Sequence, residues 1–115
     1  MTSASTFVSD YVEGFNAAVA AGEFGPLLAR FTDDAVLRFE NVPPEAASLE
    51  FAGHQAIADA YAQNPPDDQI DLTGQPVARG EHVTVPFAWR RDQSAGVLDF
   101  VLSDGLIGAL TVIFG

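Results

Sequence analysis

The chain has 115 residues and no cysteine, and its 16 acidic residues against five arginines give a net charge of −11. A chain of this length is expected to form one domain, residues 1–115, whose core needs no disulfide or metal. The acidic residues are spread along the chain, nine in residues 1–59 and seven in residues 60–115, so charge repulsion argues against a nucleic-acid partner. The absence of cysteine excludes a thiolate nucleophile and a Cys-rich zinc site.

The sequence carries no sign of export or membrane insertion. Residues 1–5 lack the basic region and the long apolar core of a signal peptide. The most apolar stretch, residues 105–115, is too short to cross a bilayer, and Asp99 and Asp104 interrupt any extension of it. We therefore expect a soluble, cytoplasmic protein with no membrane partner.

The N-terminal part has the pattern of two helices. Apolar residues recur at the three-and-four spacing of an amphipathic helix through residues 7–19, which predicts a helix over residues 4–21. Pro26 suits a first helical turn and predicts a short second helix that includes Phe31 and ends near Asp33. The two helices are expected to form a hairpin.

A strand, a loop and a third helix are predicted next. Residues 35–40 are typical of a strand, and the polar segment around residues 43–44 has no periodicity, so no regular structure is expected there. Gly53 begins a third helix with one apolar face, and residues 64–66 end it.

The hydrophobic period then changes from 3.6 to 2. Four segments rich in β-branched and aromatic residues follow, namely 69–79, 82–91, 95–102 and 106–114. The turns between them have hairpin spacing and predict an antiparallel meander, in which Pro86 marks an edge or a bulge. Helices followed by a meander indicate an α+β fold, in which a curved sheet wraps over a helical layer and can enclose a ligand cavity.

Asp99 is the sharpest candidate for chemistry, because it is the only ionisable residue in the apolar run 95–102. A buried carboxylate without a partner is costly, so such a group becomes neutral and can then donate a hydrogen bond. Alternatively, Asp99 lies on the solvated face of an edge strand or pairs with an arginine. The residues alone leave both interpretations open.

Four other polar residues are candidates of lower specificity. Tyr61 lies on the apolar face of the third helix, where its hydroxyl needs a partner or a cavity. Glu40 ends the first strand, either as a general base at a cavity mouth or as an ordinary solvated residue. His54 suits a structural role at a helix start, His82 is expected to face solvent, and neither has a third ligand nearby, so no metal site is predicted. Nucleotide-binding motifs are also absent, and no cofactor is expected.

Four segments, in their order and spacing, resemble the nuclear transport factor 2-like superfamily, nearest to its ketosteroid isomerase and SnoaL-like polyketide cyclase branches. They are residues 15–23, 27–36, 51–57 and 98–100. The resemblance implies a cone-shaped, curved antiparallel β-sheet wrapped around three helices, which is a cystatin-like α+β barrel enclosing an apolar pocket.

The resemblance also implies roles for individual residues. In ketosteroid isomerases an Asp base moves a proton while a Tyr and a protonated Asp hold the dienolate oxygen. The protonated Asp falls on Asp99, which would then face inward, and a supporting Tyr falls on Tyr61. The Tyr of the first helix falls on Phe15, which has no hydroxyl. The general base falls on Phe39, and only a one-residue shift would bring Glu40 there.

An apolar pocket is implied along the inner face of the sheet. The residues that match or neighbour its lining are Phe15, Phe31, Phe39, Val83, Val85, Phe87, Trp89 and Phe114. The phenylalanines at the matched Tyr and Asp positions favour a binding protein of isomerase-like ancestry that holds the enolate or carbonyl oxygen of a small steroid- or polyketide-like molecule.

Two alternatives remain. One is an active isomerase, cyclase or lyase in which Asp99 and Tyr61 hold the oxygen and Glu40 is the base. The other is a structural homodimer formed through an apolar outer sheet face, which is compatible with either function.

Overall fold

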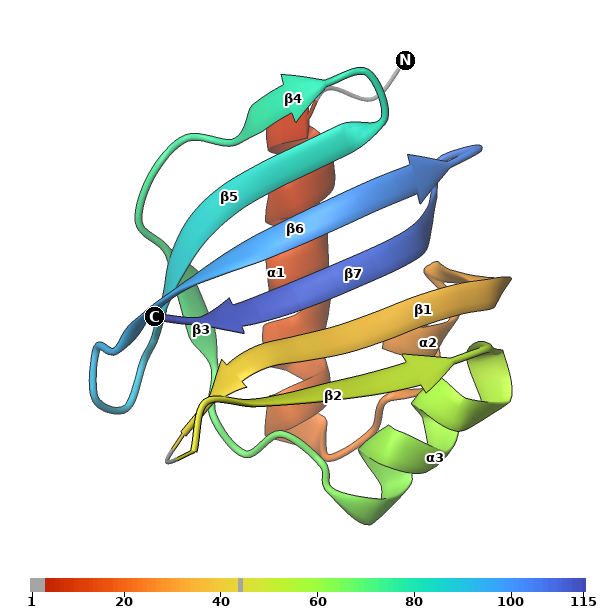
Figure 1. Cartoon of the computed structure of the whole chain (residues 1–115), viewed down its shortest axis with the longest axis horizontal. Helices are drawn as coiled ribbons and strands as arrows, with labels where there is room; N and C mark the ends of the chain where they lie inside the picture. The colour runs from red at the N-terminus through yellow and green to blue at the C-terminus, as the bar shows by residue number, and fades with distance from the viewer. Residues whose placement is uncertain (1–3, 44) are drawn as a thin grey trace.

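The computed structural model describes residues 4–43 and 45–115, so Pro44 of the predicted loop lies outside the described residues (Figure 1). The helices are α1 (Ala4–Ala21), α2 (Gly25–Leu28) and α3 (His54–Gln63). The strands are β1 (Phe31–Val42), β2 (Ala47–Ala52), β3 (Ile70–Leu72), β4 (Val77–Arg79), β5 (His82–Trp89), β6 (Ala95–Ser103) and β7 (Leu106–Phe114). Among these described helices, none is long and apolar enough to cross a bilayer.

The seven strands form one curved sheet in the order β2-β1-β7-β6-β5-β3, with β4 also paired to β5. The predicted α+β class is confirmed, and so is the antiparallel meander of β5, β6 and β7. The predicted curved sheet over three helices is confirmed as well. The sheet is unclosed and mixed, because β1 joins the last strand, β7, in parallel while the other pairings are antiparallel, and β2 is left as a free edge.

Helix α1 has the predicted bounds and lies behind the sheet (Figure 1). Its buried stripe is Val8, Tyr11, Phe15 and Ala18, at the spacing of one helix face. The ring of Tyr11 meets the edge of Phe100 on β6 at a centroid distance of 5.0 Å. This stripe packs on the inward residues of the sheet and forms the core.

The second helix is shorter than predicted, because Phe31 belongs to β1. Helix α2 ends at Leu28, and the backbone N–H of Ile107 on β7 donates to the carbonyl of Arg30. That contact draws the chain into the sheet, where Phe31 pairs with Ile107 and is buried. Pairing in the sheet outweighs the short helical signal.

The segment after β1 was predicted to be irregular but contains strand β2, which pairs with β1 in antiparallel register from Val36–Ala52 to Val42–Ala47. Most of β2 is exposed, and only Phe51 is half-buried. Because so little of β2 is buried, its sequence does not alternate between apolar and polar residues, and periodicity could not predict the strand. Gly53 then has φ +94°, a conformation that favours glycine, and leads into α3.

The predicted segment 69–79 is two strands, β3 and β4, separated opposite Pro86. The carbonyl of Pro86 accepts a hydrogen bond from the Thr73 N–H at 3.1 Å. The N–H and C=O of one residue in an antiparallel strand point to the same side, so the N–H that proline lacks would have pointed into the gap between β3 and β4. Gly74 lies against the same ring, because a Cβ there would be 2.8 Å from Pro86 Cγ. Pro86 therefore marks a local edge within an otherwise interior strand.

Candidate functional site

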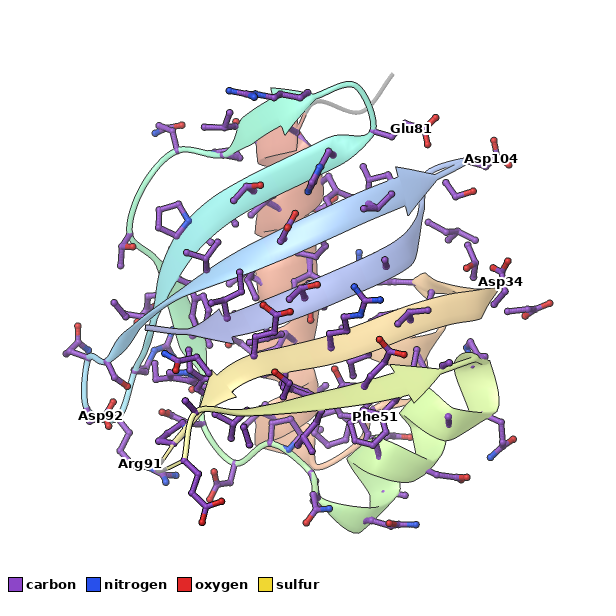
Figure 2. All side chains as sticks on the ribbon, in the orientation of Figure 1. Asp34, Phe51, Glu81, Arg91, Asp92 and Asp104 are labelled. Atoms are coloured by element: carbon purple, nitrogen blue, oxygen red, sulfur yellow. The ribbon has the colours of Figure 1, made fainter. Side chains whose placement is uncertain are left out.

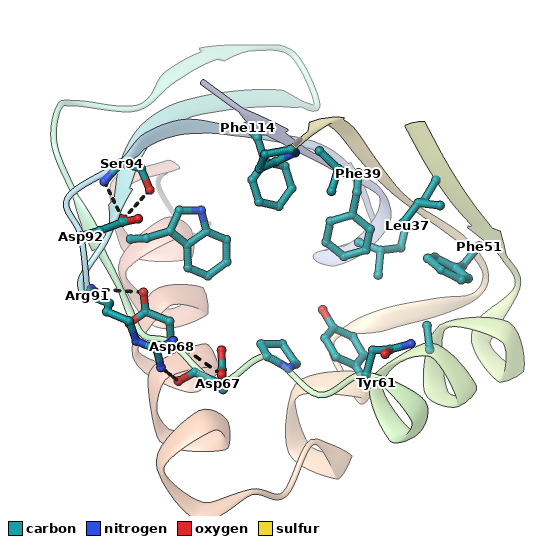
Figure 3. A pocket seen from close by; sticks show the side chains of 17 residues that line it. Leu37, Phe39, Phe51, Tyr61, Asp67, Asp68, Arg91, Asp92, Ser94 and Phe114 are labelled. Atoms are coloured by element: carbon teal, nitrogen blue, oxygen red, sulfur yellow. Dashed lines mark hydrogen bonds and ion pairs between the residues drawn. The ribbon is translucent and has the colours of Figure 1, made fainter. Parts of the chain in front are cut away.

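A cavity of about 510 Å³ lies between the inner face of the sheet, α3, the loop that follows α3 and the turn between β5 and β6 (Figure 3). This volume is in the range that holds small organic ligands. Its apolar wall is formed by Leu37, Phe39, Phe51, Tyr61, Trp89 and Phe114. Its polar rim includes Asp67, Asp68, Arg91, Asp92 and Ser94.

Aromatic rings form a continuous part of the wall. Trp89 stacks on Phe114 with ring centroids 5.9 Å apart, and Phe39 lies next to Phe114 at 6.4 Å and to Phe51 at 6.2 Å. These residues come from β1, β2, β5 and β7, whose inward side chains meet only because those strands share one curved sheet. Such a wall suits a flat, largely apolar molecule.

Tyr61 brings a hydroxyl into this apolar space (Figure 3). Its ring stacks on Phe24 at 5.2 Å, nearly parallel, which holds the side chain in place. Its hydroxyl is hydrogen-bonded to that of Tyr11 on α1, so the two helices present a pair of phenols. A smaller cavity of about 30 Å³ extends from this point towards the core between Tyr11, Tyr61 and Phe15.

Both phenols of this pair are neutral near pH 7. Burial raises the pKa of Tyr61 to about 12, although the hydrogen bond with Tyr11 acts in the opposite direction. Burial, together with the neighbouring Tyr61, raises the pKa of Tyr11 well above its ordinary value. Because Tyr61 keeps its proton, its hydroxyl can donate a hydrogen bond to a bound molecule.

The rim of the cavity is charged and braced. The backbone N–H of Arg91 donates to an Asp68 carboxylate oxygen at 3.1 Å, and its guanidinium donates to the Asp67 carbonyl at 2.9 Å. Asp92 accepts the Ser94 backbone N–H at 3.0 Å and the Ser94 hydroxyl at 2.5 Å. These Ser94 hydrogen bonds lower the pKa of Asp92, so its carboxylate is ionised at the rim.

Asp99 does not face the cavity, which corrects the expectation of an inward, neutral acid. Its neighbours Leu98 and Phe100 are buried on the inner face, and Asp99 therefore points to the outer face. There it hydrogen-bonds to His82, with Thr84 at 3.5 Å. This position agrees with the alternative prediction that Asp99 lies on a solvated face of the sheet. It differs in two details, because β6 is an interior strand and not an edge strand, and the partner of Asp99 is a histidine and not an arginine.

Glu40 is also on the outer face, and its side chain is exposed. The inward residues of β1 are Leu37 and Phe39, and no shift of register brings Glu40 into the cavity. The expectation of Glu40 as a general base is therefore wrong. Only Tyr61, of the three predicted catalytic residues, lies in the cavity.

The eight predicted lining residues divide into three groups. Phe39, Trp89 and Phe114 lie along the main cavity. Phe15 and Phe87 reach only its small inner extension. Phe31, Val83 and Val85 pack in the core away from either space, because the helices fill that end of the sheet.

The sequence analysis missed Tyr11, Leu37 and Phe51. Tyr11 is one helical turn before Phe15, and a tyrosine within the buried stripe of α1 was a signal that its hydroxyl needs a partner. Phe51 was not predicted to line the cavity, because the strand that carries it, β2, was not predicted. Among residues 4–43 and 45–115, no cluster of three or more His, Cys, Asp or Glu is arranged to hold a metal ion.

No protein-family model matches the chain, and no curated protein matches it in sequence. Solved structures do match. An NTF2-like protein of unknown function from Mesorhizobium loti has a TM-score of 0.67 and 19% identity, and the match covers 100% of this chain and 96% of that one. A proposed ketosteroid isomerase from Kribbella flavida has a TM-score of 0.65 and 19% identity, with 97% of this chain and 77% of that one covered. A proposed polyketide cyclase from Sinorhizobium meliloti has a TM-score of 0.62 and 18% identity, with 90% and 93% covered.

Fold and cavity together define an α+β protein in which an open, curved sheet and three helices enclose an apolar pocket. This architecture is the nuclear transport factor 2-like fold, as the likeness to these structures shows.

Proposed function

We propose that the protein binds a small, largely apolar molecule through one oxygen atom, which accepts a hydrogen bond from Tyr61. The observation that carries the proposal is the pair of buried, neutral phenols at the inner end of an apolar cavity. Hydrogen bonds in such a dry environment are stronger than in water. The names given to two proteins of the same fold suggest a steroid- or polyketide-like ligand with a carbonyl or enolate oxygen.

Binding without proton abstraction is the better supported form of this function. A general base must lie within hydrogen-bond reach of the proton that it removes. Glu40 and Asp99 lie on the other face of the sheet. The carboxylates at the rim are engaged by Arg91 and Ser94.

The test is a titration with equilenin, a flat phenol that mimics a dienolate, followed by the fluorescence of Trp89, the only tryptophan. We expect Tyr61→Phe to weaken binding about tenfold or more, because one hydrogen bond to an ionised oxygen contributes about 1.5–3 kcal/mol. Asp99→Asn is the matched control and should bind like the wild type. Equal affinity of wild type and Tyr61→Phe would contradict the proposal, as would selective loss in Asp99→Asn.

A second copy of the chain is the partner that we propose for the outer sheet face. Val101 is 43% exposed there. Val97 and Ile113, which pair with each other four residues away along β6, are half-buried on the same face. We expect light scattering to give about twice the chain mass of 12.2 kDa, and Val101→Asp to give the monomer. Leu106→Asp, at the β6–β7 turn and 40% exposed, should remain dimeric. A monomeric wild type would refute this proposal.

A further inference from the structure

The polar residues of the outer sheet face form one row that crosses five strands. This face is turned away from α1, and Figure 2 shows its side chains from the front. Paired residues of neighbouring strands lie side by side, so the registers fix the members of the row. They are Thr84 of β5, Asp99 of β6, Thr111 of β7, Arg38 of β1 and Glu50 of β2.

Two members of this row, Asp99 and Arg38, carry opposite charges and are separated by β7. Oδ1 of Asp99 contacts His82 and Thr84, whereas its Oδ2 has no partner in the part of the chain that the structure describes. Nε of Arg38 donates to Glu50 at 2.6 Å, and its two terminal nitrogens have no partner within the same described residues. Each of the two residues therefore keeps an atom with which it can bind a second molecule.

A second copy of the chain can lie on this face in more than one orientation, and the charges distinguish them. Two identical sheets that pack face to face are related by a two-fold axis that lies between the sheets and parallel to them. If the axis followed the polar row, across the strands, Asp99 would face the partner's Asp99 and Arg38 the partner's Arg38. If the axis follows β7, the order of the row is reversed, and Asp99 faces the partner's Arg38. Like charges repel and opposite charges attract across an interface, so the second orientation is favoured.

A neighbouring row of the same face agrees with an axis along β7. It lies two residues further along the strands and contains His82, Val101, Ala109, Val36 and Ala52. When this row is reversed about β7, Val101 faces the partner's Val36, and Ala109 faces the partner's Ala109. Apolar side chains thus meet apolar side chains beside the charged pairs, as is expected in the core of an interface.

We propose that two copies of the chain pack through this face about an axis along β7, and that ion pairs between Asp99 and the partner's Arg38 fix their orientation. The inference rests on the dimer proposed above and specifies its geometry. Because both copies use the same surface, the ion pair occurs twice. Asp99, the one ionisable residue of an apolar run, then acts between molecules and not in the cavity.

Charge reversal tests the pairing. Asp99→Arg sets two arginines against each other at both ion pairs, and Arg38→Asp sets two aspartates there. We expect each variant alone to weaken the dimer about tenfold or more in sedimentation velocity, because like charges replace opposite ones. An equimolar mixture of the two variants restores opposite charges at both pairs, so the mixture should dimerise nearly as well as the wild type. Asp59→Arg, at an exposed position of α3 on the other side of the sheet, makes the same change of charge and should leave the dimer intact.

Cross-linking tests the same orientation without charge reversal, should either variant not fold by circular dichroism. The chain has no cysteine, so an introduced thiol is the only one. Thr84 and Glu50 are the ends of the polar row, and an axis along β7 brings Thr84 opposite the partner's Glu50. A mixture of Thr84→Cys and Glu50→Cys should then be linked by a short bis-maleimide, and neither variant alone should be.

The outcomes separate this inference from the dimer itself. A monomeric wild type refutes both. A dimeric wild type whose charge-reversal variants are also dimeric, or whose mixed variants stay monomeric, overturns the ion pair and leaves the dimer. Linkage of Thr84→Cys to itself would place the axis across the strands and would overturn the inference as well.

Discussion

Replacing Phe100 by alanine is expected to lower the free energy of unfolding by about 3–5 kcal/mol. The side chain is fully buried, and its ring meets Tyr11 at 5.0 Å and Phe7 at 5.2 Å, both edge-on. Phe100 is one of the residues on which α1 packs against the sheet, so its removal leaves a cavity beneath the helix. A loss of this size is a large part of the stability of a small domain.

Urea denaturation followed by Trp89 fluorescence measures this change. Val77→Ala is the control, because Val77 on β4 is 58% exposed and lies outside the proposed dimer contact. It should change the free energy of unfolding by less than about 0.5 kcal/mol. Similar losses for the two variants would show that Phe100 is not at the centre of the core.

The native protein is expected to form no tyrosinate at pH 10, where an ordinary tyrosine is about half ionised. Tyr11 and Tyr61 are the only two tyrosines, and both are buried. The pKa of Tyr61 is about 12 and that of Tyr11 is also raised, mainly by burial. The near-ultraviolet absorbance of tyrosinate, compared between native protein and protein unfolded in urea, checks this directly.

The same shift makes stability depend on alkaline pH, with a definite sign. Between about pH 10 and 12 the folded chain keeps the Tyr61 proton that the unfolded chain releases. The stability contributed by this group is complete below pH 10 and is lost as the pH rises towards 12, by about 1.4 kcal/mol per pH unit. In Tyr61→Phe this dependence should be reduced. Tyrosinate appearing in the folded protein near pH 10 would contradict the buried phenol pair.

The directions of some side chains could be predicted from the sequence, and the directions of others could not. In β1, apolar Leu37 and Phe39 alternate with Arg38 and Glu40, so the period of 2 already indicates that Glu40 faces out. Figure 2 draws the side chains on this outer face of the sheet, which is turned away from α1. In β6 both alternating sets are apolar around Asp99, and periodicity cannot tell which set faces the core. The packing of α1 on Phe100 decides it, and Asp99 is left outside.

The candidate site was predictable only in its parts. Tyr61 and Trp89 were expected to face inward from the periodicity of α3 and β5, and Phe114 was expected in the pocket from the resemblance to the superfamily. The partner of Tyr61 is Tyr11, fifty residues earlier in the chain, and no local pattern joins them. The hydrogen bond between them does not exist until α1 and α3 pack on the sheet.

The sequence by itself determined the amphipathic span of α1, the hairpin-linked strands β5, β6 and β7, and the α+β class, because these depend on residues close together in the chain. The tertiary structure decided the parallel pairing of β1 with β7, the exposed edge strand β2 and the face on which Asp99 lies. It also assembled the phenol pair in the cavity. Each of these depends on contacts between distant segments, whose energy no short stretch of sequence contains.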